Sequence, residues 1–217
     1  GWAVLAFATA ALDVYLVVAA RSAGALLGLS LGVAALSLLM GLRVSGVATR
    51  GLLTGLLAIL VVAMAASYRW LTAAAIETGA AMFDKDPTLT GRTYLWYRAN
   101  DLIAEAPLLG RGYSAFWIQG NTDAEGLWRY AGIAERGGFT FHNIGVEVLV
   151  HLGWIGLFLF AATLLIGVLA LIWSFVVRPN LSLCFWVSIL LYEVVRMPIE
   201  SVGMAPFHFS TVLIFGA

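Results

Sequence analysis

A succession of long apolar segments constrains the fold of this chain more than any other feature of its sequence. A transmembrane α-helix needs about 20 consecutive apolar residues. Five segments come close to that length or exceed it, and a sixth begins near the end of the chain. These segments are Trp2–Ala20, Gly24–Leu42, Gly51–Ser67, Ile144–Val177, Leu181–Arg196 and the stretch from Pro206 onward. Charged residues make up only 11% of the chain, less than half their share in soluble domains. The sequence therefore predicts an all-α polytopic membrane protein.

The apolar segments divide the chain into three parts. Residues 1–67 hold three predicted spans, residues 68–142 form one long polar loop, and residues 143–217 hold three more spans, the last of them truncated. The span that begins at Ile144 is too long for one crossing, so we expect its first turns to stand outside the bilayer. Because Gly1 is not a Met and leads directly into an apolar stretch, we expect the chain to be the C-terminal part of a longer protein.

Basic residues in the short loops predict the orientation. Arg43, Arg50 and Arg178 flank two short connections that contain no acidic residue. The positive-inside rule places such connections in the cytoplasm. The long loop, Arg21 and Glu200 then lie together on the outer side of the membrane.

Charge and cysteine content exclude several classes of function. Basic and acidic residues number 12 each, so no overall positive field attracts nucleic acid. The single cysteine, Cys184, excludes an internal disulfide and a cysteine-cluster metal site. His142, Glu147 and His151 do not have the spacing of the His-Glu-x-x-His zinc motif. Asp84-Lys85-Asp86 resembles the Asp-x-Asp metal motif of sugar-nucleotide transferases, but no nucleotide-binding α/β unit surrounds it. We therefore predict no metal site and no cofactor.

Three glycines at four-residue spacing, Gly24, Gly28 and Gly32, lie within the second apolar segment. Small residues at this spacing let a second helix approach closely. We expect them to mark a helix–helix contact and not a functional site.

Arg92 opens a predicted helix in the polar loop. Thr90 is a suitable N-cap, and the helix should end near Glu105, just before Pro107. Arg92 and Trp96 lie one turn apart on the same face. An arginine at a helix N-terminus opposes the helix dipole, which is reasonable if an anion binds there. An ordinary surface ion pair is the alternative.

Two further positions in the loop have functional and structural interpretations. Arg111 lies between Gly110 and Gly112, so the backbone there can turn sharply and approach a ligand, although a plain structural turn has the same pattern. His142 precedes a long apolar helix, whose dipole favours the neutral ring that a general base needs. A helix-capping histidine is the alternative.

Five motifs follow one another along the chain: Arg21, Thr88–Trp96, Pro107–Tyr113, His142-Asn143 and Leu152–Leu157. Taken in this order, they resemble the bacterial O-antigen ligase and polymerase family over Ala19–Ser201. Asp86–Arg92 and Glu200-Ser201 are most similar to the exopolysaccharide polymerase branch of that family.

The resemblance implies a GT-C-type helical bundle in the bacterial inner membrane, with its active site facing the periplasm. It implies an inverting, metal-independent glycosyltransferase that moves a glycan from undecaprenyl pyrophosphate to an acceptor hydroxyl. His142 corresponds to the catalytic base, and Arg21 and Arg92 correspond to the pyrophosphate-binding arginines. Arg111, Trp96 and Glu200 complete the predicted substrate-binding residues.

Several alternatives remain open at this stage. The acceptor is a growing glycan in a polymerase and lipid A-core in a ligase. A transporter of the same lipid-linked glycans is a different class of function, and a non-catalytic scaffold is another. Four tryptophans are candidates to offer ring faces to sugars, with a membrane-interface belt as the alternative: Trp70, Trp96, Trp117 and Trp128. If His142 is only a cap, the base has to be sought among Glu147, His151 and Glu200.

Overall fold

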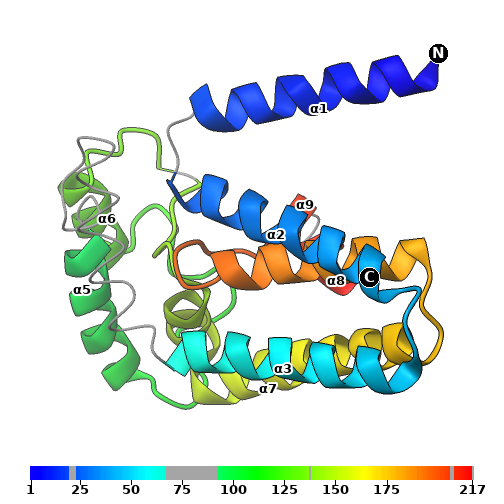
Figure 1. Cartoon of the computed structure of the whole chain (residues 1–217). Helices are drawn as coiled ribbons and strands as arrows, with labels where there is room; N and C mark the ends of the chain where they lie inside the picture. The colour runs from blue at the N-terminus through cyan, green and yellow to red at the C-terminus, as the bar shows by residue number, and fades with distance from the viewer. Residues whose placement is uncertain (20–22, 67–91, 137, 206–207, 217) are drawn as a thin grey trace.

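The computed structural model describes residues 1–19, 23–66, 92–136, 138–205 and 208–216 of the chain. Every regular element in these ranges is a helix (Figure 1). The helices are α1 (Trp2–Ala19), α2 (Ala23–Leu42), α3 (Val47–Ala66), α5 (Arg92–Glu105), α6 (Thr122–Tyr130), α7 (Ile144–Val177), α8 (Leu181–Arg196) and α9 (Phe209–Phe215). Five residues of these predictions lie outside the described residues, so the predictions made for them stay predictions: Arg21, Trp70, Asp84, Asp86 and Thr90.

Most of the observed helices agree with the predicted ones. The bounds predicted for the long segments differ from those of α1, α2, α3, α7 and α8 by four residues at most. Among the described residues, α7 is the helix that is long and apolar enough to cross a membrane, and Phe7–Val17, Gly28–Leu42 and Val47–Leu57 form shorter apolar helical stretches. The helical membrane fold is therefore supported. The short helix α6 was not predicted; Asn121 caps it, and acidic side chains occupy its first turn.

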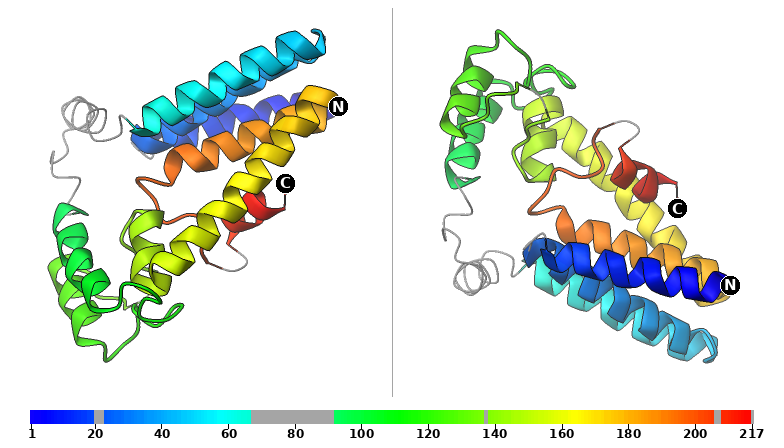
Figure 2. Two further views of the ribbon diagram at one scale, coloured as in Figure 1. Left: turned by 90° about the horizontal axis from the view of Figure 1, so that it is seen from below. Right: turned by 90° about the horizontal axis from the view of Figure 1, so that it is seen from above.

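The long helices lie side by side, and α5 and α6 stand at one end of them (Figures 1 and 2). The most extensive packing joins α2 to α8. A Cβ atom on Gly28 would lie 3.0 Å from the Tyr192 ring, and one on Gly32 would lie 3.5 Å from Tyr192 Cβ. The predicted glycine contact is thereby confirmed for these two positions, and its partner is α8.

Arg50 connects the ends of α2 and α7 at the end of the bundle that lies away from α5 and α6. Its buried guanidinium donates to Val176 O at 3.0 Å, to Arg43 O at 3.4 Å and to Ser45 O. The last carbonyls of a helix have no partner within that helix, so an arginine at this place satisfies them. The connections predicted to face the cytoplasm therefore lie together at one end.

The predicted span beginning at Ile144 is not one continuous helix. Gly153 has φ 65° and ψ −166°, which breaks α7 into an outer part, residues 144–152, and an inner part, residues 154–177. The structure thus separates the first turns of this helix from the rest, and the separation follows from a local break in the backbone.

The loop 107–112 fills the break. In an unbroken helix the N–H groups of Trp154 and Ile155 would donate to residues 150 and 151. Here they donate instead to Pro107 O at 2.8 Å and Leu108 O at 3.2 Å. The carbonyls of residues 150 and 151 in turn accept from the N–H groups of Arg111 and Gly112, at 2.8 and 2.9 Å. The Pro107–Tyr113 and Leu152–Leu157 motifs are therefore two halves of one junction.

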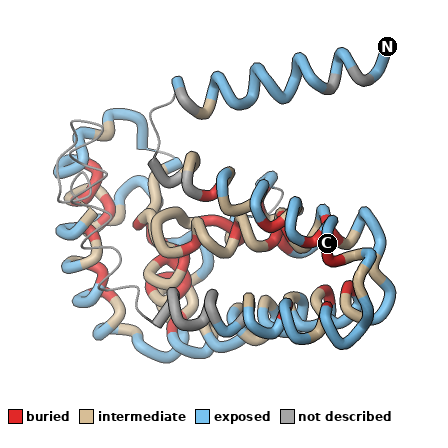
Figure 3. Tube along the Cα trace, viewed as in Figure 1, coloured by how far each residue is buried: buried red, intermediate tan, exposed pale blue. Residues whose placement is uncertain are grey.

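A buried cluster joins α5, α6 and the outer part of α7, and it shows as buried stretches in Figure 3. Its members are Leu95, Ala99, Leu102, Phe116, Ala124, Leu127, Trp128, Phe141 and Val150. Because Trp128 is only 1% exposed, its ring packs in this core and does not present a face to a sugar. The cluster fixes α5 and the loop segments relative to α7, which positions the site described next.

Candidate active site

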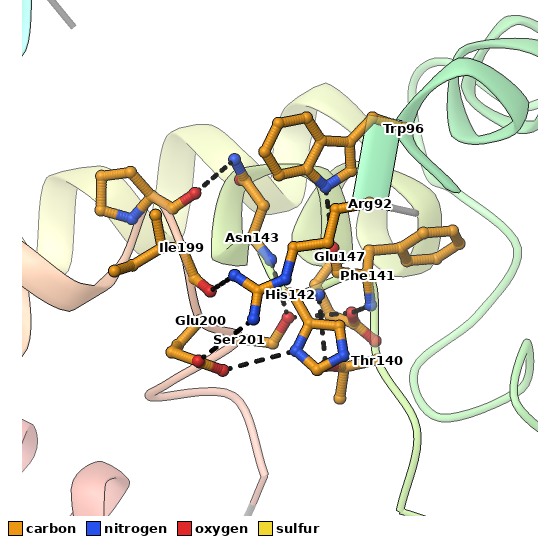
Figure 4. A network of polar contacts seen from close by, with 11 residues as sticks. Arg92, Trp96, Thr140, Phe141, His142, Asn143, Glu147, Ile199, Glu200 and Ser201 are labelled. Carbon is orange, nitrogen blue, oxygen red and sulfur yellow. Dashed lines mark hydrogen bonds and ion pairs between the residues drawn. The ribbon is translucent and has the colours of Figure 1, made fainter. Parts of the chain in front are cut away.

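The segment before α7 and the segment after α8 meet at one end of the bundle (Figure 4). Asn143 is the N-cap of α7. Its backbone N–H donates to Ser201 Oγ at 3.2 Å, and its side-chain amide donates to Pro198 O at 3.0 Å. The N–H of Ile144 donates to Met197 O at 3.1 Å. These bonds hold the residues on either side of Asn143 next to the turn that carries Glu200.

His142 and Glu200 face each other across this junction. His142 Nδ1 lies 3.4 Å from Glu200 Oε2. The side chains are 31% and 38% exposed, so both are accessible from outside the bundle. The backbone of His142 has φ 53°, a left-handed conformation that is uncommon for residues other than glycine. The Phe139 ring packs edge-on at 5.7 Å from the imidazole.

Helix α5 brings Arg92 and Trp96 to the same place. Arg92 donates through Nη1 to Ile199 O at 2.7 Å, and its Nη2 lies 3.5 Å from Glu200 Oε1. Trp96 donates through Nε1 to Phe141 O at 2.8 Å. Both contacts come from one face of the helix, as their spacing predicted. Arg92 therefore acts on Glu200, and Trp96 holds the peptide that precedes His142.

Glu200 is held in its charged form by its neighbours. Burial alone would raise the pKa of its carboxyl, but the hydrogen bond with His142 and the positive charges of Arg92 and Arg196 outweigh burial, and the pKa is lowered below its ordinary value. Glu200 is therefore an ionised bridge between a histidine and an arginine.

A second carboxylate, Glu147, lies beneath this pair and is only 5% exposed. Its Oε1 accepts from Trp117 Nε1 at 3.0 Å. Its Oε2 accepts from the N–H of Phe141 at 2.7 Å and from Ser201 Oγ at 3.1 Å. Glu147 therefore satisfies three donors from three separate segments of the chain.

His151 is buried one turn further along α7. Its Nδ1 accepts from the N–H of Ser114 at 3.0 Å. Its Nε2 lies 3.3 Å from Glu147 Oε1, in a geometry that does not form a hydrogen bond. Because Nδ1 is an acceptor, the neutral ring carries its proton on Nε2, which faces the carboxylate.

Arg111 lies elsewhere. Its guanidinium pairs with Glu105 and, at 3.2 Å, with Asp123. Its described ion pairs are thus with carboxylates of α5 and α6, and none joins it to His142 or Glu200.

The structure therefore brings together four of the predicted site residues: His142, Arg92, Trp96 and Glu200. It adds Glu147, which the sequence offered only as an alternative base, and Ser201, which the sequence marked only as part of the Glu200-Ser201 motif. An acidic side chain inside an apolar segment is itself a signal of function, and Glu147 fits that description. In the part of the chain that the structure describes, no three His, Cys, Asp or Glu side chains are grouped to hold a metal ion.

Two comparisons with known proteins match parts of the chain that include residues of this site. The O-antigen ligase family profile matches residues 8–161, more than half of the chain, and the matched range includes Arg92 and His142. Over 136 residues the chain is 40% identical to the exopolysaccharide production protein ExoQ of Rhizobium meliloti (strain 1021). That alignment covers 61% of this chain and 31% of the relative, so the chain spans less than a third of the relative it matches. No solved structure matches the chain.

Proposed function

The chain belongs to the O-antigen ligase and polymerase family, and from this premise we propose that it carries the active site of a GT-C-type membrane glycosyltransferase. The enzyme transfers a glycan from undecaprenyl pyrophosphate to an acceptor hydroxyl and so extends an exopolysaccharide. The observation that carries the proposal is the contact of His142 with Glu200, which also lies against Arg92.

His142 is the general base. When its Nδ1–H donates to Glu200, the lone pair of Nε2 is available for the proton of the acceptor hydroxyl. The acceptor oxygen then forms a bond to the anomeric carbon as the bond from that carbon to the bridging phosphate oxygen breaks. The undecaprenyl pyrophosphate leaves with the electron pair, and the proton resides on His142. Attack opposite the leaving group inverts the anomeric centre.

Arg92 and Arg21 stabilise the leaving group. A guanidinium has five N–H donors, and the two described contacts of Arg92 leave others for phosphate oxygens. Permanently charged arginines bind phosphate through two parallel hydrogen bonds and can balance the charge that develops on the bridging oxygen. On this mechanism the reaction needs no divalent metal.

We favour polymerisation over ligation because the 40% identical relative is named for exopolysaccharide production. The alternative acceptor is lipid A-core, which the description of the matched family as O-antigen ligase supports. Transport of the same lipid-linked glycans is disfavoured, because transporters place their ionisable groups near the bilayer midplane. Here His142 and Glu200 lie outside α7 and α8, at an end that we assign to the periplasm of the bacterial inner membrane.

The test is to incubate the full-length protein in membranes with lipid-linked repeat units and to resolve the products. We expect a ladder of lengthened glycans on the lipid. Single transfer to lipid A-core would indicate a ligase, and movement of lipid across the bilayer without transfer would indicate a transporter. The ladder should also form in EDTA, whereas a strict need for a divalent ion would make Asp84 and Asp86 candidate ligands.

A further inference from the structure

Glu147 is a buried carboxylate that the proposed reaction does not use. We propose that it is a positioning residue that sets the distance between His142 and Glu200. This role rests on the proposed function of that pair. Glu147 lies in the first turn of α7 and touches neither His142 nor Glu200 in any described contact; it acts through the residue next to each of them.

A single oxygen atom of Glu147 joins the segment that carries His142 to the segment that carries Glu200. Its Oε2 accepts from the N–H of Phe141, the residue before His142, and from the hydroxyl of Ser201, the residue after Glu200 (Figure 4). The same hydroxyl accepts from the N–H of Asn143, the residue after His142. His142 is therefore flanked by two backbone N–H groups that are tied, directly or through Ser201, to Glu147. A shift of either segment has to break one of these bonds.

The backbone of His142 requires such restraint. A non-glycine residue at φ 53° persists only when its surroundings over-determine it. The residue that precedes it is held at both of its backbone polar atoms, since Phe141 O accepts from Trp96 Nε1 and Phe141 N–H donates to Glu147. Without the Glu147 bond, the left-handed conformation at His142 loses one of the contacts that impose it.

The surroundings of Glu147 demand a carboxylate and not an amide. Three donors point at it: Phe141 N–H, Ser201 O–H and Trp117 N–H. His151 Nε2, its titratable neighbour, lies 3.3 Å from Oε1. An ionised carboxylate is acceptor-only, whereas a glutamine has one acceptor oxygen and an NH₂ group. In Glu147→Gln the NH₂ group must face at least one existing donor, although the side chain keeps its size.

The first measurement does not depend on the reaction. Hydrogen exchange of the peptide that contains Phe141 is followed in the full-length protein in membranes. We expect Glu147→Gln to speed exchange at Phe141 by about tenfold or more, because a charged acceptor is replaced by a neutral amide that cannot accept at both oxygen positions. The matched control is Glu125→Gln, the same substitution at a carboxylate that pairs with Arg136 at 3.0 Å in α6. It should leave exchange at Phe141 unchanged.

The second measurement separates positioning from a merely structural role. Glu147→Gln should lower kcat by roughly 10- to 100-fold, while KM for the lipid-linked donor stays within about twofold of wild type. Ser201→Ala removes only one of the two bonds to Oε2 and should show a smaller fall in kcat with the same unchanged KM. Glu125→Gln should leave both constants unchanged.

A third readout follows Glu200 itself by infrared difference spectroscopy of its carboxyl. His142, Arg92 and Arg196 are the groups that lower its pKa. If Glu147 sets the spacing, Glu147→Gln weakens the contact with His142 and raises the pKa of Glu200.

Unchanged exchange at Phe141 together with an unchanged kcat and Glu200 titration would overturn the proposal. If Glu147→Gln does not fold, Ser201→Ala decides, and a wild-type kcat in that variant would overturn it as well. If the wild-type protein transfers no glycan, the proposed function fails, yet the exchange and infrared measurements still show whether Glu147 holds the two segments together.

Discussion

The two parts of α7 are one helix in sequence and two different structures in space. The outer part, residues 144–152, buries two ionisable side chains, Glu147 and His151, at 5% and 4% exposure. The inner part, residues 154–177, presents large apolar side chains outward, with Phe158 at 71% and Trp173 at 70% exposure. The outer part is therefore the polar core of a site, and the inner part suits a surrounding of lipid.

Hydropathy alone does not distinguish the part of α7 that forms the candidate site from the part that suits a surrounding of lipid. Both parts belong to one apolar run that reads as a single long span. What distinguishes them is the break at Gly153 and the loop 107–112 docked in it. The break gives the outer part neighbours of its own, from α5, the loop and the segment after α8, and these neighbours supply the partners of its polar groups.

The largest effect on the protein should come from a substitution at Gly153, where α7 is broken. Gly153→Ala places a Cβ 2.4 Å from the backbone of Leu108 at a residue with φ 65°. We expect a loss of more than about 3 kcal/mol of stability, or no folded protein. Gly167→Ala is the matched control in the inner part, because nothing lies within 4 Å of a Cβ there, and it should be neutral or slightly stabilising. Thermal unfolding in detergent compares the two, and similar transitions would mean that the break is not a required boundary.

The next largest effect should fall on the reaction at the outer part. His142→Ala should lower the single-turnover rate by roughly 10²–10⁴-fold, the usual contribution of a general base, while donor binding is retained. His208→Ala, which removes the N-cap side chain of α9, should leave the rate within about twofold of wild type. A wild-type rate in His142→Ala would mean that His142 is not the base and would direct attention to Glu147, His151 and Glu200.

Arg92 tests whether the outer site binds an anion. Arg92→Ala should lower kcat/KM by about 10²–10³-fold, a typical loss for one charge-stabilising group. Arg92→Lys should recover only part of this, because lysine lacks the planar fork that binds phosphate oxygens in pairs. Steady-state kinetics with a lipid-linked donor measure both variants. Full recovery by lysine would point to simple charge balance of Glu200, with no bidentate contact to phosphate.

The smallest effect should be a dependence of stability on pH. The folded-state pKa of Glu200 is lowered, so its ionised form stabilises the protein above the ordinary glutamate pKa. That contribution is lost as the pH falls through the lowered value. Since Glu200 is 38% exposed, we expect less than about 1 kcal/mol. Unfolding of wild type and Glu200→Gln is compared from neutral to acidic pH; the difference should disappear at the acidic end, and a constant difference would contradict the assignment.

Much of the fold follows from the sequence because its determinants are local. Apolar length predicts α7 and α8 at their observed bounds, and the helix ending at Glu105 follows from Pro107. The spacing of Arg92 and Trp96 likewise places both on one face, since that relation needs only helical geometry.

The remaining features depend on contacts between distant segments. Glu200 was predicted to bind substrate, but its place against His142 depends on the turn after α8. The break at Gly153 requires a loop more than 40 residues earlier in the chain. The aromatic ring of Trp128 is of the kind that binds sugars, and only the packing of α6 shows that this ring lies in the hydrophobic core. Periodicity carries no information about such partners.

The junction between the loop 107–112 and Gly153 also bears on the order of assembly. With the loop absent, the backbone groups of residues 150, 151, 154 and 155 can form hydrogen bonds with one another as in an ordinary helix. An unbroken α7 is therefore an alternative to the native, broken one. The loop is synthesised before α7, and its two donors and two acceptors are therefore available when Gly153 emerges. The continuous helix and the broken helix satisfy the hydrogen bonds of these four backbone groups of α7 equally well. The native one prevails because docking also satisfies the polar groups of the loop, so docking of the loop has to precede maturation of α7.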